Sequence, residues 1–537
     1  MVLFNTHRFD ENAEPLNLTD PDAVPGPMPM ARLSDETPTG NSESYVCLMF
    51  YDDLSDLPDA EGDESVGLTL YLPSALNLVD SEGESLWKFR GASLCAWQHG
   101  LSPPLRAYEI AIDPVHGRLL FGVTDQTGEA NVIADGLYAS STYGFSGPTG
   151  AHPVARESIT DGDIIRVRYS SLIDETGVSH TVTDGSGVQE ALNDVHLRTS
   201  ALVIQIEDSR VYDLNLASVT GIDTELGISV LRLNAPLHIR AATGQRPVIR
   251  LTRPFACRPQ DVLDPSVAEL DVAFEGIYLS WDHASAAFAA DTPLIARAAV
   301  NRLLINGCTL DPGSHESLGG VRQPPRYAMS LDNAYGFDPT GGEDFDQVPQ
   351  VVLKHSICGP IAMDDGYALS LEHSIVDAAS GRGDDSPALA VHAASGDAQT
   401  QWGPALSLLG MTCFGRMRVE SATGEGGIWV HGLQVHDDQT GCISHSYFAA
   451  AGNKLPRFQA CVFGDVVMLS FVSEVFGEAG YAQLRLRSDR KILEQGPNND
   501  AMGAFGYLLN SHKWKNIGIR YREFMPVGIR PVLVPVT

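Results

Sequence analysis

A short pattern of apolar and polar positions recurs through the second half of the chain. An apolar residue is followed by any residue, then by His, Asn, Gly or Ala, then by a small or neutral residue and further apolar positions. Two alternating strands on either side of a tight corner produce this pattern when the turns of a coil stack on one another. The copies begin at Phe274, Leu304, Leu353, Leu371, Leu408, Val430, Ile443 and Phe458.

The pattern predicts an all-β fold, a right-handed parallel β-helix whose interior is filled by the apolar residues. We expect the coil over 201–487, beginning with the strand-like run Leu202–Ile206. At roughly 22 to 25 residues per turn this gives about a dozen turns, and at ~4.8 Å per turn a rod of ~60 Å. Insertions at 311–350 and 378–404 interrupt the period, and such loops are where partners contact a solenoid.

Four flanking segments have different textures. Residues 1–44 are rich in Pro and acids, so we expect an extended or disordered arm that can lie over a neighbouring subunit. Residues 45–180 hold short strand-like runs between turn residues, which predicts a small β-rich N-terminal domain. Residues 181–200 predict a short helix that caps the first turn of the coil. Residues 488–537 predict a C-terminal cap of helix and strand, with Leu508, Leu509, Trp514, Ile517 and Phe524 available for its inner face.

Charge excludes some classes of partner. The chain has 68 acidic against 36 basic residues and a net charge of -32. This argues against nucleic acid and against anionic membrane surfaces, because both are bound through Lys and Arg. No apolar run approaches the roughly 20 residues of a membrane span, and the first residues lack the features of a secretory signal. We therefore expect synthesis in the cytoplasm without a signal peptide, and exit only by lysis or within a particle.

Cysteine and histidine positions favour structural roles. Of the eight cysteines, Cys308, Cys358, Cys413 and Cys461 fall in or beside the repeat, which predicts free thiols packed in the coil. There is no CxxC and no Cys/His cluster at zinc spacing. The acidic run 52–64 lacks the spacing of an EF-hand and is interpreted as a solvated loop. We expect no metal and no cofactor. His355, His373 and His445 share one corner of the repeat and predict a hydrogen-bonding ladder.

Catalysis on such a scaffold would need carboxylates gathered on neighbouring turns. Gly383-Asp384-Asp385 resembles the Gly-Asp-Asp segment of polygalacturonase-like glycosidases, but the accompanying Asn-Thr-Asp, Gly-His-Gly and Arg-Ile-Lys segments are missing. Trp281-Asp282-His283 resembles a tripeptide of pectate lyases, without an arginine to act as their base. Adjacent acids arise by chance in so acidic a chain, so solvated turns are the favoured interpretation. The catalytic alternative rests on Asp364, Asp365, Asp384, Asp385 and His392, with 436–438 as a further acidic candidate.

Two regions are similar to a known group of proteins. Ala111-Ile-Asp-Pro114 through Gly117-Arg118-Leu-Leu-Phe121 resembles the IDPxxGRxxF strand-turn-strand of phage-tail-related proteins, and Tyr143-Gly-Phe-Ser-Gly147 follows it as in those chains. Residues 481–505 resemble the closing segment of an uncharacterised bacterial β-helix (pectate-lyase-like) family associated with phage-tail-like contractile injection particles. The resemblance covers about 75–537 and carries no catalytic residue. The acidic arm and the insertion at 311–350 depart from the family.

Three classes of function follow from these expectations. The first is a non-enzymatic structural or attachment component of a contractile injection particle, peripheral to its baseplate or tube, as a spike or fibre-like element. Its partners would be other particle proteins, reached through the arm and the coil loops, with a cell-surface glycan left open. The second is a polysaccharide-degrading β-helix enzyme, a lyase or glycoside hydrolase. The third is a free-standing cytoplasmic binding module.

Overall fold

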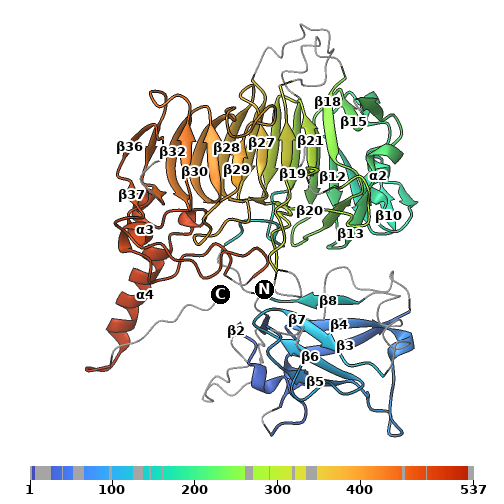
Figure 1. The fold of residues 1–537 in the computed structure, drawn as a ribbon. Coiled ribbons are helices and arrows are strands. Elements are labelled where there is room, and N and C mark those ends of the chain that lie inside the picture. Colours follow the sequence, from blue (N-terminus) through green and yellow to red (C-terminus); the bar gives the residue numbers. More distant parts are fainter. Residues whose placement is uncertain are drawn as a thin grey trace.

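The computed structural model describes residues 3–5, 26–38, 40–52, 66–95, 100–124, 137–143, 147–159, 162–225, 227–260, 270–289, 291–316, 321–333, 348–449, 454–478 and 480–529. The chain is mostly β, as predicted, and large parallel sheets form its main body (Figure 1). A smaller unit of two three-stranded sheets lies below that body in the same view. The acidic run expected at 52–64 falls almost wholly outside the described residues.

The main body repeats one arrangement, because each turn from β12 to β33 adds one strand to each of three ladders. The strands within each ladder pair in parallel with their counterparts one turn away. The first ladder contains β9 (Asp163–Arg168), β12 (Leu202–Ile206), β16 (Leu237–Ala241), β19 (Asp271–Glu275), β22 (Arg302–Asn306), β25 (Gln350–Lys354), β28 (Ala368–Asp377), β30 (Ala405–Phe414), β32 (Ala422–Trp429), β34 (Cys442–Ser444) and β36 (Arg457–Gln459).

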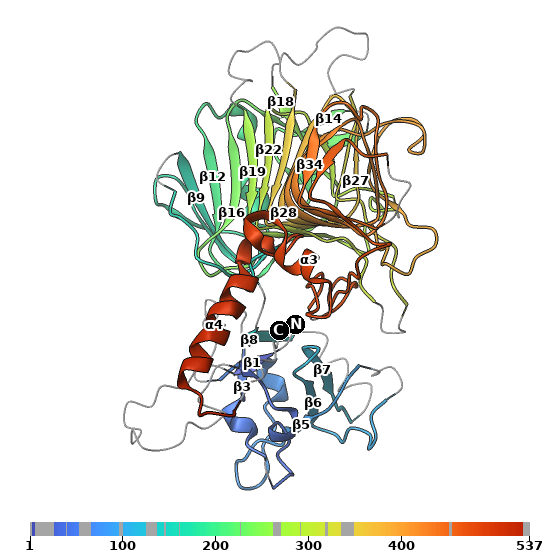
Figure 2. The same cartoon turned by 90° about the vertical axis from the view of Figure 1, so that its left-hand side faces the viewer.

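The other two ladders complete each turn, as the end-on view of Figure 2 shows. The second contains β13 (Val211–Leu214), β17 (Val248–Leu251), β20 (Tyr278–Trp281), β23 (Thr309–Leu310), β26 (Ile357–Cys358), the second halves of β28, β30 and β32, then β35 (Tyr447–Phe448) and β37 (Val462–Phe463). The third contains β15 (Ile228–Leu233), β18 (Phe255–Pro259), β21 (Ile295–Ala298), β24 (Met329–Leu331), β27 (Ile361–Met363), β29 (Leu389–His392), β31 (Arg416–Val419) and β33 (Leu433–Val435), with β14 (Asp223–Glu225) antiparallel at its start.

The core runs through the centre of this body because the register keeps equivalent side chains above one another. Alternate residues of each first-ladder strand point inward, and one inward position is apolar in seven successive turns. Every side chain in that column is buried, so each turn covers the apolar surface of the next. The column consists of Ile204, Ile239, Phe274, Ile305, Leu353, Leu371 and Leu408.

The corner between the first and second ladders explains the sequence repeat. From β19 onward, one residue at each corner adopts positive φ, for example 45° at His355 and 47° at His373. This left-handed conformation favours Gly and tolerates His and Asn better than branched side chains. Gly276, Gly307, Gly410, Gly426, His445 and Ala460 take the same place in other turns. The pattern beginning at Val430 was assigned to the wrong corner, since that turn uses Gly426.

A hydrogen-bond ladder does follow this corner, but serine and cysteine build it, one residue after the positive-φ position. Ser374 Oγ accepts from Ser356 N at 3.2 Å and lies 2.7 Å from Glu372 O, to which it donates. Ser356 Oγ in turn accepts from Cys308 N at 3.1 Å. The predicted histidine ladder is wrong, because Nδ1 of His355, His373 and His445 has no hydrogen-bond partner.

The thiols fit the packing predicted for them. Cys308, Cys358 and Cys413 are free thiols buried inside the coil, and Cys461 is a half-buried free thiol. Burial raises the pKa of the Cys308 thiol to about 12, so this side chain stays protonated and acts as a small apolar group.

The N-terminal unit has its own core. β3 (Val46–Tyr51), β4 (Leu68–Pro73) and β8 (Tyr138–Ser141) form one sheet, and β5 (Lys88–Gly91), β6 (Glu109–Asp113) and β7 (Arg118–Phe121) form the other. The expectation of an extended arm over 1–44 does not hold for the described part of that range. Leu3, Met28 and Leu33 are buried in this core, and β1 (Phe4–Asn5) pairs with β2 (Gly26–Pro27). A few apolar residues in this range therefore belong to the core, although the range as a whole is rich in Pro.

The segment 147–159 ties this unit to the flank of the coil. Gly150 N donates to His355 O at 2.7 Å, and Ala151 N donates to Thr309 Oγ1 at 2.9 Å. Further along, Arg156 Nη1 donates to Ala242 O at 2.9 Å. The segment thus crosses several turns of the coil next to the positive-φ corner, and its hydrogen bonds hold those turns together.

The start of the coil lies earlier than predicted. β9 pairs in parallel with β12, and β10 (Ser171–Ile173) and β11 (Ser179–Thr181) continue it as antiparallel strands, so the body begins at Asp163 and not at 201. The helix expected at 181–200 forms only as α2 (Gly187–Ala191) and a 3-10 turn at Val195–Leu197. Its Val188 and Leu192 are buried against the first strands.

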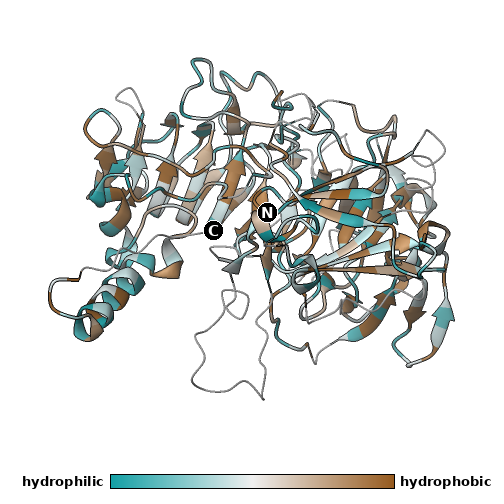
Figure 3. Cartoon of the chain, turned by 90° about the horizontal axis from the view of Figure 1, so that it is seen from below, coloured by the Kyte–Doolittle hydropathy of each residue, from teal (hydrophilic) through white to brown (hydrophobic). Residues whose placement is uncertain are grey.

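The far end differs more from the expectation. The last strands, β36 and β37, end at Phe463, and the chain then leaves the coil through irregular turns to α3 (Arg490–Glu494) and α4 (Asn510–Phe524). α4 has no buried residue, and Leu509, Ile517 and Phe524 are exposed. The helix projects away from the body and is mostly hydrophilic along its length (Figures 1 and 3). It is therefore not a cap over the last turn.

We predict that the serine ladder is a measurable part of the stability of the coil. Ser374→Ala leaves the buried Ser356 N–H without its acceptor, which should lower the free energy of unfolding by about 1–3 kcal/mol. Ser370→Ala, on the same strand at a half-buried position, is the matched control and should change it by less than about 0.5 kcal/mol. Urea unfolding followed by circular dichroism measures both; equal effects of the two substitutions would contradict the role of the ladder.

Candidate functional site

The first carboxylate pair from the sequence is split between two roles. Asp364 is buried, and its Oδ1 accepts hydrogen bonds from Ala394 N and Ser395 N, both at 2.9 Å. Its Oδ2 accepts from Asn333 N at 3.2 Å. Asp365 is exposed and accepts from Asn333 Nδ2 at 2.9 Å. Asp364 therefore fastens loops of successive turns, and its oxygens are already used by main-chain donors.

The second pair does not meet the histidine that was grouped with it. Asp384 and Asp385 are exposed on a turn before β29, and no hydrogen bond or ion pair joins them to His392 within the fully described loop 378–404. His392 is buried, with Nε2 3.0 Å from Tyr327 Oη and Nδ1 2.6 Å from Ala393 O. Burial lowers the pKa of His392, so it is a neutral side chain held in the third ladder.

The remaining acidic candidates are also turn residues. Asp282 Oδ1 accepts from Ala284 N at 2.9 Å, next to the buried Trp281. Asp437 Oδ1 accepts from Gln439 N at 2.9 Å and from Thr440 N at 3.2 Å, and these bonds, with one from the Thr440 hydroxyl, lower its pKa. Such bonds are typical of Asx turns. Each carboxylate stabilises its own turn, and the structure does not bring the candidates together.

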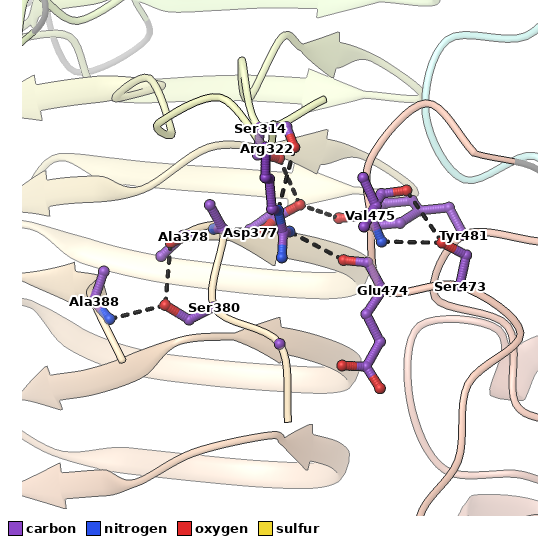
Figure 4. Close-up of polar contacts among 12 residues, drawn as sticks. Ser314, Arg322, Asp377, Ala378, Ser380, Ala388, Ser473, Glu474, Val475 and Tyr481 are labelled. Atoms are coloured by element: carbon purple, nitrogen blue, oxygen red, sulfur yellow. Dashed lines mark hydrogen bonds and ion pairs between the residues drawn. The ribbon is translucent and has the colours of Figure 1, made fainter. Parts of the chain in front are cut away.

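A buried polar cluster that the sequence did not predict lies where the chain returns to the flank of the coil (Figure 4). Asp377, at the end of β28, is completely buried. Its Oδ2 accepts from Ser314 Oγ and Tyr481 Oη, both at 2.8 Å, and its Oδ1 accepts from Ala379 N at 2.7 Å. Arg322 Nη2 lies 3.4 Å from Oδ1 and donates to Glu474 O at 3.0 Å.

This cluster joins three segments that are far apart in the sequence: the insertion after β23, the end of β28 and the irregular chain after β37. Burial raises the pKa of Asp377, and the Arg322 charge and the two hydroxyl donors oppose that rise. Nearby, Arg382 forms an ion pair with Glu474, which adds a second link between the same flank segments. The side-chain partners of Asp377 lie 55 to 104 residues away from it in the sequence, so no local spacing could have predicted them.

Two hollows lie between the flank of the coil and the C-terminal segment. The smaller, of about 210 Å³, is lined by His373, Gly410, Pro497 and Tyr507. The His355 and His373 rings stack with centroids 5.2 Å apart, and the Tyr507 ring lies 4.7 Å from His373. Burial, with a smaller contribution from His355, lowers the pKa of His373 to about 4, so the stack is neutral at pH 7.

The larger hollow is a cleft of about 830 Å³ between α3, α4 and the chain at 482–486. Its volume lies in the range of ligand-binding clefts. None of the carboxylates proposed from the sequence lines it; the acids in its wall are Glu494 and Asp500. Sequence reasoning missed this cleft, because it placed α4 over the last turn of the coil.

The described part of the chain contains neither a cluster of metal ligands nor a helix that could span a membrane. Within it, no three His, Cys, Asp or Glu side chains gather as they would around a metal ion. Within it, too, every helix is too short or too polar to cross a membrane.

Comparison with known proteins adds no relative. No protein-family model, no curated protein and no solved structure matches the chain. Function must therefore be inferred from the fold and its surfaces.

We predict that the Asp377 cluster stabilises the flank segments in a pH-dependent way. Tyr481→Phe removes a donor to a buried carboxylate and should lower the free energy of unfolding by about 1–3 kcal/mol. The Tyr481 hydrogen bond favours the ionised form of Asp377. The loss should therefore be full once the pH exceeds the raised pKa of Asp377, and should shrink as that carboxyl is protonated.

Urea unfolding of both proteins at several pH values tests this. Tyr521→Phe, on the exposed face of α4, is the control and should have no effect at any pH. A destabilisation by Tyr481→Phe that does not vary with pH would show that the hydroxyl acts through packing alone.

Proposed function

We propose that this protein is a non-enzymatic structural or attachment component of a phage-tail-like contractile injection particle, peripheral to its baseplate or tube. We further propose that its body is a right-handed parallel β-helix. The function is an assembly role: the coil is a rigid element, and its uncovered end and projecting helix bind other subunits.

The three parallel ladders support the β-helix. Each turn from β12 to β33 passes once through each ladder, and strands one turn apart pair in parallel. A chain that returns to a parallel neighbouring strand almost always does so with a right-handed crossover. The handedness follows from that rule and from the resemblance of the sequence to right-handed coils.

The observation that carries the assembly role is the uncovered C-terminal end. All three residues of β36 are exposed, and Phe458 is 53% exposed on the last turn. An unpaired strand edge and exposed apolar side chains promote association with other chains. α4 adds to this, since a 15-residue helix without a buried residue gains little from tertiary packing. A partner protein that covers β36 and α4 in a complex would bury both of these exposed surfaces.

The proposed role in a particle is based on the sequence resemblance. The structure of the IDPxxGRxxF segment is consistent with that resemblance. The IDPxxGRxxF segment forms the β6–β7 hairpin, in which buried Asp113 accepts from Val115 N at 2.9 Å and from Leu94 N at 2.6 Å. Arg118 Nη1 donates to Leu94 O at 2.9 Å. The motif residues thus have structural roles, as expected for a resemblance that extends to architecture and not to catalysis.

We predict that the purified protein degrades no polysaccharide. Asp364 is engaged by main-chain donors, and Asp384 and Asp385 lie on an open turn, so no acid–base pair is assembled from them. Incubation with polygalacturonate, alginate and bacterial surface glycans should release neither reducing ends nor unsaturated products. Turnover that is lost in Asp384→Asn or Asp385→Asn would instead establish the enzyme alternative.

We predict that the protein sediments with contractile particles and that α4 is required for this. Deletion of 513–537 removes most of a helix without buried residues, so the truncated chain should stay soluble and unfold cooperatively. Particles isolated by ultracentrifugation should contain the full chain, located near the baseplate or tube by immunogold electron microscopy, and should lack the truncated one. Recovery of the full chain only in the soluble fraction would contradict the proposed function.

A further inference from the structure

The cleft beside α4 has an apolar interior that the rest of the described chain leaves empty. Leu484, Leu493, Met502, Trp514 and Ile517 contribute to its wall. Ile517 lines the cleft and is still 40% exposed. An apolar cleft of about 830 Å³ bordered by a helix without buried residues would gain stability from an occupant that covers both.

The rim of the cleft has a charge opposite to that of the chain. Arg485, Arg490, Lys513 and Lys515 line it, against Glu494 and Asp500. Glu494 is already paired, 3.3 Å from Arg490 and 3.4 Å from Lys515. In a chain with a net charge of -32, this excess of cations is a local exception and favours an acidic occupant.

A buried acceptor in the wall gives a second, independent indication of an occupant. Asp500 is completely buried. Its Oδ1 accepts from Ser511 N at 3.0 Å and from the Ser511 hydroxyl, while Oδ2 has no hydrogen-bond partner among the described residues. An unsatisfied buried carboxylate oxygen is costly. The occupant should therefore carry a donor as well as apolar and acidic groups, as an extended polypeptide does.

We propose that the cleft binds residues 6–25 of a second copy of this chain. This segment, which lies outside the described residues, carries five acids against one arginine, with Leu16 and Leu18 as apolar anchors: Asp10, Glu11, Glu14, Asp20 and Asp22 against Arg8. Main-chain N–H groups and Asn17 supply donors. The described residues on either side of it, Asn5 and Gly26, pair with each other in β1 and β2, and 20 residues of sequence lie between them.

Exchange of this segment between two copies predicts a dimer. Each chain has one such segment and one such cleft, so two chains can bind each other reciprocally through two identical contacts about a twofold axis. The second contact then forms within an existing complex, which raises the overall affinity. This inference is independent of the proposed particle role, because it is tested on the purified chain alone.

The test combines sedimentation equilibrium with peptide binding. The full chain should be a dimer that weakens in 1 M NaCl, and a fluorescein-labelled peptide of residues 6–25 should bind a chain in which 6–25 is replaced by a Gly/Ser linker. R490E/K513E should weaken both associations by on the order of tenfold or more. R520E/R522E reverses two charges of the same helix that do not line the cleft, and should leave both associations unchanged.

Three peptide variants and one variant of the chain address the anchors and the buried acceptor. Peptides with Leu16→Ser and Leu18→Ser should lose binding, whereas Val24→Ser should not. Asp500→Asn replaces the unpaired oxygen or its neighbour by an amide and should weaken peptide binding while leaving the thermal unfolding of the free chain no lower than that of the wild type.

Mixing two complementary variants tests whether the segment of one chain binds the cleft of another. The cleft variant R490E/K513E and a segment variant E11K/E14K should each be monomeric alone, and should form a heterodimer together, because one retains an intact segment and the other an intact cleft. A wild-type chain that is monomeric at all concentrations overturns the proposal, as does a dimer that survives R490E/K513E. A third outcome also overturns the proposal: the chain is monomeric and binds the labelled peptide only after its own residues 6–25 are removed. This result would show that the segment binds the cleft of its own chain.

Discussion

The structure depends on a hydrogen-bonded corner that keeps successive turns in register. One residue with positive φ turns the chain from the first ladder into the second. Where a serine follows it, the hydroxyl accepts a main-chain N–H from the turn before, as Ser356 does from Cys308 and Ser374 does from Ser356. Because this corner has constant length in every turn from Gly276 to Ala460, the inward column of apolar residues stays aligned. Length variation is confined to the connections around the third ladder, where insertions can grow without moving the core.

Those connections, and the chain beyond the last turn, contain the polar chemistry of the molecule. Asp364 and Asp377 are both buried, yet both have their oxygens occupied by donors from neighbouring loops. They stabilise the flanks of the coil instead of facing a substrate. Three features at the C-terminal end are open to a partner: the exposed strand β36, the projecting α4 and the cleft with Asp500 in its wall. This distribution supports the proposed assembly role more than a catalytic one.

The sequence predicted what is local and periodic. The spacing of apolar residues located the corner in most turns, and burial of Cys308, Cys358 and Cys413 followed from their place in the repeat. Features that depend on contacts between distant segments were missed. The partners of Asp377 come from loops without a motif, and Leu3 and Leu33 join a core through sheets formed far along the chain. Apolar residues of α4 suggested an inner face, but amphipathic spacing does not specify what the helix packs against; Ile517 and Phe524 are exposed.

Hydrogen exchange measured by mass spectrometry, on the isolated chain at low concentration and on its assembled form, tests this account most directly. The account predicts slow exchange in the first-ladder strands from β12 to β34 in both states, because each of these strands is paired on both sides. It predicts fast exchange in β36, β37 and α4 of the isolated chain, and protection of the same segments after assembly. Fast exchange throughout the ladders, or strong protection of α4 in the isolated chain, would contradict a register-locked coil with an uncovered end.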